Sequence, residues 1–491
     1  MPDTLSTPAT FPVTLPEAMQ RKLQTLEHVP GLPAGAVTRF AEILASLDDW
    51  QLYRLSPLQL VREHGIELPL LLDLLLHSTR LGLFDLNWTV VCPGCGSIEY
   101  TFETINALKT GTVFCPTCNR DFAFVLDEQV EVSFSLHPGI NDLSGTIDPY
   151  ASFENYSRYY FTQSLKRTPE LLAYIQAQYR GFFVAGSDEH INLALSAEPD
   201  SLYRVINLQT HSQFFLRTGS ESAGLPVVVE TDLGERGFVE SERQVPAGEL
   251  TIRVHNCSSR RSILTLWKAD FTELYRIASE FPCSQEPFLT AKMLLNSQTF
   301  REIYRIQQLD PDLRLSIGNQ TLLFTDLKGS TAMYEETGDY QAYSLVQRHF
   351  DKLMACTRRH SGSVVKTIGD AIMASFSTPL DGLRAALEMI HEIHHLNQAS
   401  GEIDLGLKVG LHTGPVLAVN ANERLDFFGQ TVNLAARVQG LAEAGEIWMT
   451  EAVYHAGAAE LLEAAGYHSE PKSAFLKGIS AATPVRRCWT D

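Results

Sequence analysis

The stretch that decides the fold of the C-terminal part is TLLFTDLKGST, residues 321–331. An apolar strand pattern ends on Asp326, and the small residues after it form a turn that opens a helix. Carboxylates at strand ends suit Mg²⁺, and backbone amides at a helix start can receive phosphate oxygens. We therefore predict that Asp326 binds a metal ion. The amides predicted to receive phosphate are those of Lys328, Gly329, Ser330 and Thr331.

A second stretch, SVVKTIGDAIMASF at residues 363–376, supplies another carboxylate. Its pattern predicts two strands folded back on each other, with Gly369 and Asp370 at the turn. Asp370 would thereby return to Asp326. Two aspartates presented by adjacent strand ends fit a two-metal site for in-line attack on phosphorus.

The size and charge of the chain bound the remaining possibilities. Its 491 residues predict about three domains, and its formal net charge is −19. Such acidity argues against wrapping nucleic acid or lying on an anionic membrane. The apolar run at residues 66–76 is far shorter than the roughly 20 residues that span a bilayer, and the N-terminus has no secretory pattern. We expect a cytoplasmic protein that does not enter the membrane.

Two C-x-x-C pairs, in VCPGCG and FCPTCN, predict a zinc ribbon. The four predicted ligands are Cys92, Cys95, Cys115 and Cys118. Four thiolates leave no open position for a substrate, so the zinc would be structural. A redox role for either pair is the alternative, disfavoured because no strand-helix context of the thioredoxin type follows.

The remaining patterns predict a multidomain chain. Residues 1–35 are expected to be a loosely held lead-in segment, and residues 36–88 a helical, winged-helix-like unit or a plain helical bundle. The predicted order continues with a zinc ribbon at 89–135, a helical connector at 148–180, an antiparallel β-sandwich at 181–270, a helical linker at 271–316 and a catalytic domain at 317–491. The β-sandwich could be a sensor or an oligomerisation surface.

From about residue 317 to 489, the sequence resembles the class III nucleotidyl cyclases, the adenylate and guanylate cyclase catalytic domain. The matching text, in the family's order, is LFTDLKGST, VVKTIGDAIMASF, VGLHTGPV, DFFGQTVNLAARVQGLA and LKG. The resemblance implies an α+β fold of the ferredoxin-like or palm type. More loosely, the predicted N-terminal arrangement resembles that of some bacterial multidomain cyclases.

The resemblance implies a role for each matching residue. Asp326 and Asp370, with the backbone carbonyl of Leu327, would bind two Mg²⁺ or Mn²⁺ ions. Asn433 would orient the ribose, and Arg437, on the same face of a helix, would neutralise charge on the pentavalent phosphorus. The lysine of LKG, Lys477, would grip the triphosphate.

The base would be chosen by Lys366 and Asp426. A lysine is a pure donor and an ionised aspartate a pure acceptor, which fits the adenine edge, whereas guanine presents the reverse pair. The predicted activity is therefore that of an adenylate cyclase, which converts ATP to 3′,5′-cyclic AMP and diphosphate. The resemblance also implies a homodimer with shared active sites.

Two alternatives remain open from the sequence. One is a cyclase for GTP or a pyrimidine nucleotide. The other is a DNA-binding regulator that uses the winged-helix-like unit and the zinc ribbon, with the cyclase fold only as a dimeriser.

Overall fold

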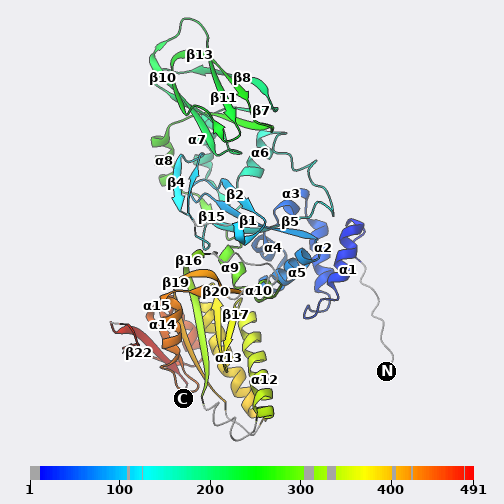
Figure 1. Cartoon of the computed structure of the whole chain (residues 1–491), viewed down its shortest axis with the longest axis vertical. Helices are drawn as coiled ribbons and strands as arrows, with labels where there is room; N and C mark the ends of the chain where they lie inside the picture. The colour runs from blue at the N-terminus through cyan, green and yellow to red at the C-terminus, as the bar shows by residue number, and fades with distance from the viewer. Residues whose placement is uncertain are drawn as a thin grey trace.

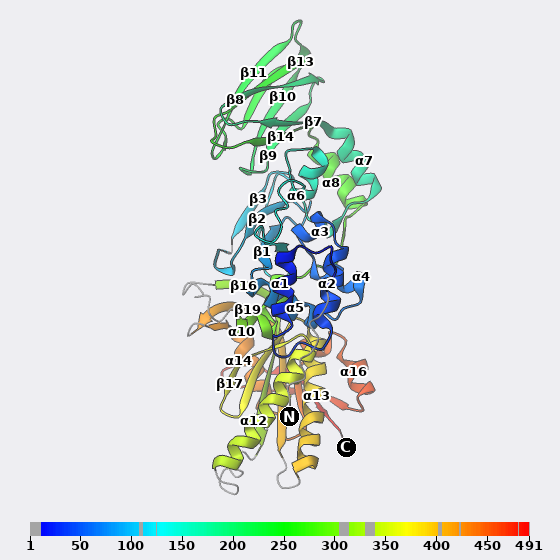
Figure 2. The ribbon, with the colours of Figure 1, turned by 90° about the vertical axis from the view of Figure 1, so that its right-hand side faces the viewer.

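The computed structural model describes residues 11–107, 111–123, 125–303, 314–328, 339–400, 405–421, 424–479 and 481–490. The molecule is elongated in both views: a β-rich unit lies at one end, the C-terminal domain at the other, and helices α1–α5 with a small sheet lie between them (Figures 1 and 2). Among the described helices, none has the length and apolar character needed to cross a membrane.

Five helices form the first part of the N-terminal half. They are α1 (Glu17–Leu26), α2 (Ala36–Ser46), α3 (Asp49–Tyr53), α4 (Pro57–His64) and α5 (Leu68–Arg80). The expectation of a loosely held lead-in is wrong for α1, because Met19, Leu23 and Leu26 are buried in the core. Their spacing is that of one helix face, and this apolar face explains why the segment packs.

The helical unit and the predicted ribbon are joined by one small sheet and share one apolar core. The central strand β1 (Phe84–Val91) pairs antiparallel with β2 (Ile98–Phe102) and β5 (Val130–Leu136). It runs across residue 88, where the helical unit was expected to give way to the ribbon. The short 3-10 helix η1 (Ile105–Ala107) follows β2, and β3 (Thr112–Cys115) and β4 (Arg120–Ala123) form a separate hairpin.

The β-rich unit is an insertion into this N-terminal core. The chain leaves the core through α6 (Phe153–Tyr160), β6 (Leu165–Lys166) and α7 (Pro169–Gln178). It returns through α8 (Phe271–Glu280) and β15 (Ser284–Gln285), which pairs with β6. The next residues run beside β5, where the amide of Val132 donates to the carbonyl of Leu289 at 2.7 Å.

The prediction of a wholly antiparallel sandwich is wrong. The strands are β7 (Tyr179–Ala185), β8 (Glu189–Ala197), β9 (Leu202–Asn207), β10 (Ser212–Ser222), β11 (Val227–Gly234), β12 (Gly237–Phe238), β13 (Glu242–Asn256) and β14 (Ser262–Lys268). The long strand β13 runs parallel to β10 in its first part and parallel to β11 in its second part. It passes from one sheet to the other near Gly248, whose φ of 117° favours glycine.

The C-terminal domain is an eight-stranded sheet with helices. Its main order is β17-β18-β16-β19-β21-β23-β22, and β20 pairs with β19. The elements are β16 (Arg314–Lys328), α12 (Asp339–Arg359), β17 (Ser363–Ile368), β18 (Ala371–Phe376), α13 (Pro379–Ser400), β19 (Gly406–Ala421), β20 (Arg424–Phe428), α14 (Gln430–Gln439), β21 (Ile447–Thr450), α15 (Glu451–Tyr454), α16 (Ala458–Ala464), β22 (His468–Ala474) and β23 (Thr483–Trp489). This is the α+β fold expected.

The two faces of this sheet pack against different parts of the chain. The helix-covered face, with Leu323, Ile372 and Leu411, packs against α12 and α13, which lie side by side (Figure 2). The shared face, with Leu322 and Met373, belongs to one apolar core with α1–α5, the small sheet and two linker helices. Those linker helices are α9 (Ala291–Leu295) and α10 (Gln298–Ile303).

Candidate active site

The two predicted metal-binding aspartates lie at neighbouring strand ends. Asp326 is near the end of β16, and Asp370 lies in the turn between β17 and β18, where Gly369 has a φ of 64°. The hydroxyl of Thr325 accepts from the amide of Ile372 at 3.1 Å, which holds the start of β18 beside β16. The predicted hairpin at residues 363–376 is confirmed.

The electrostatics of this pair fit a divalent cation. Burial raises the pKa of Asp326, the nearby Asp370 raises it further, and Lys408 opposes both effects. Oδ2 of Asp370 is buried without a hydrogen-bond partner among the described residues. A buried carboxylate oxygen that lacks a hydrogen-bond donor destabilises the folded state, and two neighbouring carboxylates repel each other. A bound Mg²⁺ or Mn²⁺ would relieve both costs, with the carbonyl of Leu327 as a further oxygen ligand.

Lys408 is a residue that the sequence analysis missed. It lies opposite Asp326 on β19, and its Nζ is 3.7 Å from Oδ2 of Asp326. The available signal was a lysine alternating with apolar residues in the strand GLKVGL. Its positive charge lies beside the carboxylate of Asp326 at this edge of the sheet.

The predicted phosphate loop is only partly described. Lys328 ends β16 and forms an exposed ion pair with Glu443 at 2.8 Å. Gly329, Ser330 and Thr331 lie outside the described residues.

The predicted base-reading residues meet each other. Nζ of Lys366 on β17 is 2.6 Å from Oδ2 of Asp426 on β20. Lys366 stands opposite Met373 in the register, which places it on the shared face of the sheet. The side chain of Asp426 is 17% exposed and that of Lys366 is 40% exposed, so the lysine can move toward a ligand more freely than the aspartate.

Arg301 of α10 reaches this pair from the N-terminal half. Its Nη1 donates to the carbonyl of Leu425 at 2.8 Å, and its guanidinium lies 5.1 Å from the ring centroid of Phe427. The guanidinium therefore holds both neighbours of Asp426. Burial lowers the pKa of Arg301 to about 10, and Asp426 opposes that shift. No motif pointed to this contact of Arg301, because Leu425 is 124 residues away in the sequence.

The third group comprises Asn433, Arg437 and Lys477. Asn433 and Arg437 lie four residues apart on α14, as predicted. A β-carbon at Gly478 would be 3.4 Å from Nη2 of Arg437, so the LKG turn lies against this guanidinium. Leu476 is buried in a small cluster with Val438 of the same helix. The turn thus presents Lys477 beside Arg437.

The predicted residues therefore form three groups: the aspartates with Lys408, the Lys366–Asp426 pair, and α14 with the LKG turn. Within the described residues, no hydrogen bond or ion pair joins one group to another. The domain thus carries a carboxylate pair with a lysine, a lysine–aspartate ion pair, and an arginine beside the LKG turn.

Comparison with known proteins decides the family. Residues 315–480 match the family described as the Adenylate and Guanylate cyclase catalytic domain. The chain contains a class III nucleotidyl cyclase domain. Residues 17–302, more than half of the chain, also place it in a family of unknown function (DUF5939). That single match spans the helices, the ribbon and the inserted β-unit of this cyclase-family chain.

Individual relatives share the cyclase region. An adenylate cyclase of Lachancea kluyveri is 31% identical over 192 residues, which are 35% of this chain and 10% of that protein. Guanylate cyclase 2G of Mus musculus is 30% identical over 176 residues, 33% of this chain and 16% of that protein. The crystal structure of the adenylyl cyclase CyaB from P. aeruginosa covers 36% of this chain and 96% of its own, at 22% identity and a TM-score of 0.32. Because both adenylate and guanylate cyclases match, the nucleotide must be argued from the site.

The cysteine cluster of this cyclase-family chain has the geometry of a tetrahedral metal site. The four sulfur atoms lie within 4.8 Å of one another. Sγ of Cys92 is 3.8 Å from that of Cys118, and Sγ of Cys95 is 3.6 Å from that of Cys115. Sulfurs at the corners of a tetrahedron with Zn–S bonds of about 2.3 Å are about 3.8 Å apart. The four thiols thus fit a zinc ion.

Proposed function

We propose that this chain is an adenylate cyclase, which converts ATP to 3′,5′-cyclic AMP and diphosphate. The observation that carries the proposal is the 2.6 Å contact between Lys366 and Asp426. It puts one obligate donor and one obligate acceptor side by side, which is the spacing that the ring nitrogen and the amine of one adenine edge require. Guanine would present a donor to Lys366 and an acceptor to Asp426, and this mismatch costs binding.

The metal-binding part of the site consists of Asp326, Asp370 and the carbonyl of Leu327. Two divalent cations bound there would supply the Lewis acidity that activates the ribose 3′-hydroxyl and balances the triphosphate charge. Asp370 contributes the buried Oδ2 that lacks a donor among the described residues. Lys408, 3.7 Å from Asp326, adds a positive charge at the same edge.

The phosphate-binding part lies on α14 and the LKG turn. Arg437 would neutralise charge on the pentavalent phosphorus with its guanidinium fork, and Lys477 would bind the triphosphate as a point charge. Asn433 would hydrogen-bond the ribose and so aim its 3′-hydroxyl at the α-phosphorus. The amides of residues 328–331 are proposed to bind further phosphate oxygens.

A homodimer would bring these groups together. The three groups lie apart on one domain, and a two-fold axis would place the aspartates of one subunit against the base-reading and phosphate-binding groups of the other. Two equivalent active sites would result. We also propose a structural Zn²⁺ at Cys92, Cys95, Cys115 and Cys118, and a cytoplasmic location.

The first test is product formation by the full chain with ATP, GTP, CTP or UTP and either Mg²⁺ or Mn²⁺. Cyclic AMP should dominate, and Asp370→Asn should lose about 10³-fold in rate, because the several kcal/mol of metal stabilisation disappears. Asp381→Asn, at the start of α13, is the control. Cyclic GMP as the dominant product would overturn the assignment to ATP.

Mixing two inactive variants tests the shared site. In an equimolar mixture of Asp370→Asn and Arg437→Ala, half of the dimers are mixed, and each mixed dimer keeps one intact site. Activity should return to about a quarter of the normal rate if the subunits exchange at random. No recovery after refolding the two variants together would contradict a site built from two subunits.

A further inference from the structure

A large cavity lies where the ribbon, helices α6–α8 and the base of the β-sandwich meet. Its volume is about 790 Å³, within the range of sites that hold drug-sized ligands. Its walls come from the cysteine knuckles, from α7 and α8, and from strands β9 and β14. None of these residues belongs to the cyclase domain, so the catalytic proposal does not account for the cavity.

Helix α8 presents an apolar face to the cavity. Four of its residues recur at the spacing of one helix face and line the cavity: Phe271, Leu274, Tyr275 and Ala278. Nevertheless, no residue of α8 is buried. On α7, Leu171, Leu172 and Ile175 line the same space, and only Leu171 is buried. An apolar occupant would bury surface that these two helices leave accessible.

The floor of the cavity holds two buried donors without partners. Arg204 is 8% exposed; its Nη1 donates to the carbonyl of Pro116 at 3.0 Å, whereas its Nε finds no partner in the described parts of the chain. Nε1 of Trp267 is likewise buried and unpartnered there. Arg204 on β9 and Trp267 on β14 stand opposite each other in the register. Cross-strand neighbours project from the same face of a sheet, so both donors can meet one acceptor group.

The lining carries more cationic side chains than carboxylates. Three further cations line the cavity, namely Arg120, Arg167 and Lys268, against the two carboxylates of Asp121 and Asp270. The carbonyl of Pro116 accepts from Nη1 of Arg204, but no described residue offers an acceptor to its Nε. The unmet requirement is a hydrogen-bond acceptor.

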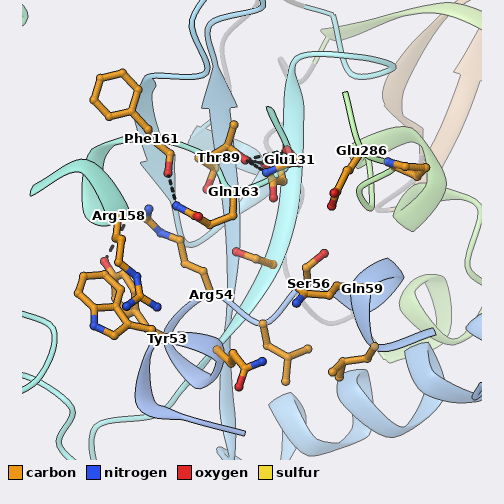
Figure 3. Close-up of a pocket in the computed structure, with 18 of the residues that line it drawn as sticks. Tyr53, Arg54, Ser56, Gln59, Thr89, Glu131, Arg158, Phe161, Gln163 and Glu286 are labelled. Carbon is orange, nitrogen blue, oxygen red and sulfur yellow. Dashed lines mark hydrogen bonds between the residues drawn. The ribbon is translucent and has the colours of Figure 1, made fainter. Parts of the chain in front are cut away.

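A second cavity in the N-terminal half shows the contrast. It measures about 480 Å³ and lies among α3, α4, β1 and β5 (Figure 3). Each charged side chain that lines it already has a hydrogen bond, an ion pair or an aromatic ring as partner: Arg54, Arg62, Glu63, Glu131, Arg158, Lys166 and Glu286. The hydroxyl of Thr89 is buried there without a partner among the described residues, but none of the charged groups of this lining has a buried donor left unpartnered, as Nε of Arg204 is in the larger cavity.

We propose that the larger cavity binds a carboxylic acid with an apolar body. The carboxylate accepts from Nε of Arg204 and Nε1 of Trp267, and the apolar body lies between α7 and α8. Charge-assisted hydrogen bonds of this kind supply both affinity and orientation, while the apolar walls supply most of the buried area. The N-terminal half would then bind a small molecule with one carboxylate and an apolar body.

The test is calorimetric titration of the full chain with decanoate, with 2-naphthoate as an aromatic arm and decanol as the uncharged control. Decanoate or 2-naphthoate should bind at least about tenfold more tightly than decanol. Arg204→Met should weaken carboxylate binding at least about tenfold, and Trp267→Phe by about threefold. Arg243→Met, on the exposed part of β13, should leave binding unchanged.

A cavity-filling variant guards against misfolding of the arginine variant. Ala278→Phe leaves both donors in place and should remove carboxylate binding, with the circular dichroism and zinc content of the parent chain retained. Equal affinity for decanol and decanoate, unchanged binding by Arg204→Met, or no binding of either acid would overturn the proposal. The measurement reads binding alone, so its result is independent of the nucleotide that the cyclase domain uses.

Discussion

The two faces of the cyclase sheet differ in what covers them. The helix-covered face packs against α12 and α13 of its own domain, and its cluster is apolar. The shared face packs against the N-terminal core, and it also carries Lys366 and His412, which stand opposite Met373 and Leu322 in the register. One face is a structural core. The other is both a domain contact and part of the proposed nucleotide site.

This difference indicates how the N-terminal half can influence catalysis. Arg301 of α10 contacts both neighbours of Asp426, and the side chain of Gln298 accepts from the amide of Val364 on β17 at 2.9 Å. A shift of α10 would therefore move the strands that carry Asp426 and Lys366. On the other face, α12 also contacts α10, because Arg358 donates to the hydroxyl of Thr299 at 2.6 Å. The cluster between that face and its helices is apolar, so substitutions of its side chains should affect stability more than activity.

Within this comparison of the two faces, the largest effect is expected for Lys366→Met, with Lys352→Met as its matched control. Lys366→Met removes the obligate donor of the shared face, and kcat/KM with ATP should fall about 10²-fold because Asp426 and the adenine acceptor both lose a charged partner. Lys352→Met breaks a similar ion pair between α12 and α13, in which Nζ of Lys352 is 2.8 Å from Oε2 of Glu392. An exposed pair contributes little, so this control should stay within about twofold. Equal losses in steady-state assays of both variants would contradict the comparison.

Arg301→Met should have the next largest effect. The variant keeps an apolar stem over Phe427 but loses the hydrogen bonds to the carbonyls of Leu425 and Leu295, both at 2.8 Å. We expect about a tenfold fall in kcat/KM for ATP and a smaller ratio of ATP to GTP turnover, because Asp426 is no longer held in place. Arg276→Met, on the exposed side of α8, is the control. A loss of thermal stability with an unchanged nucleotide ratio would restrict Arg301 to a structural role.

Much of the cyclase domain could be predicted from the sequence, because its information is local. The hairpin at residues 363–376, the position of Asp326 near the end of a strand and the spacing of Asn433 and Arg437 all follow from the periodicity of apolar residues and from turn chemistry. The parallel pairing of β13 with two neighbours could not be predicted from the sequence. The periodicity of a strand indicates which of its residues share a face, but it does not indicate which strands pair. The same limit hid Arg301, whose contacts join distant segments.

Other features were readable and were missed. The helix face of α1, with Met19 and Leu23, has the ordinary apolar spacing, and Pro and Thr around it obscured the pattern. Lys408 is a charged residue in an otherwise apolar strand, and the alternation of side chains along the strand indicates on which face of the sheet it lies. We predicted successive domains in the N-terminal half and did not predict that the β-rich unit is an insertion. The pairing of β6 with β15, which shows the insertion, joins segments far apart in the sequence.

Asp127 offers a smaller test, at the junction of the ribbon with the shared face. It accepts from the amides of Gly318 at 2.8 Å and Asn319 at 3.0 Å, and from Lys292 at 3.2 Å. Asp127→Asn should weaken this junction by about 2 kcal/mol, since one amide oxygen cannot replace two carboxylate oxygens. Hydrogen exchange at residues 318–319 should quicken by about 30-fold, whereas Asp121→Asn, exposed on β4, should leave it unchanged. Unchanged exchange in the Asp127 variant would mean that the junction does not depend on this carboxylate.

The smallest predicted effect concerns His412, which donates to or accepts from the hydroxyl of Thr450 at 2.8 Å. Burial lowers the pKa of His412 to about 4, below the value of about 6.5 in the unfolded chain. Between these values the unfolded state binds more protons, so stability falls as the pH falls through this window. From about pH 7 to about pH 5.5, this histidine should account for a loss of about 1 kcal/mol in the free energy of unfolding. His412→Gln should remove that part of the pH dependence in urea titrations. His391→Gln, on the exposed side of α13, is the matched control, and an equal change in both variants would show that the shared face buries no histidine whose charge matters.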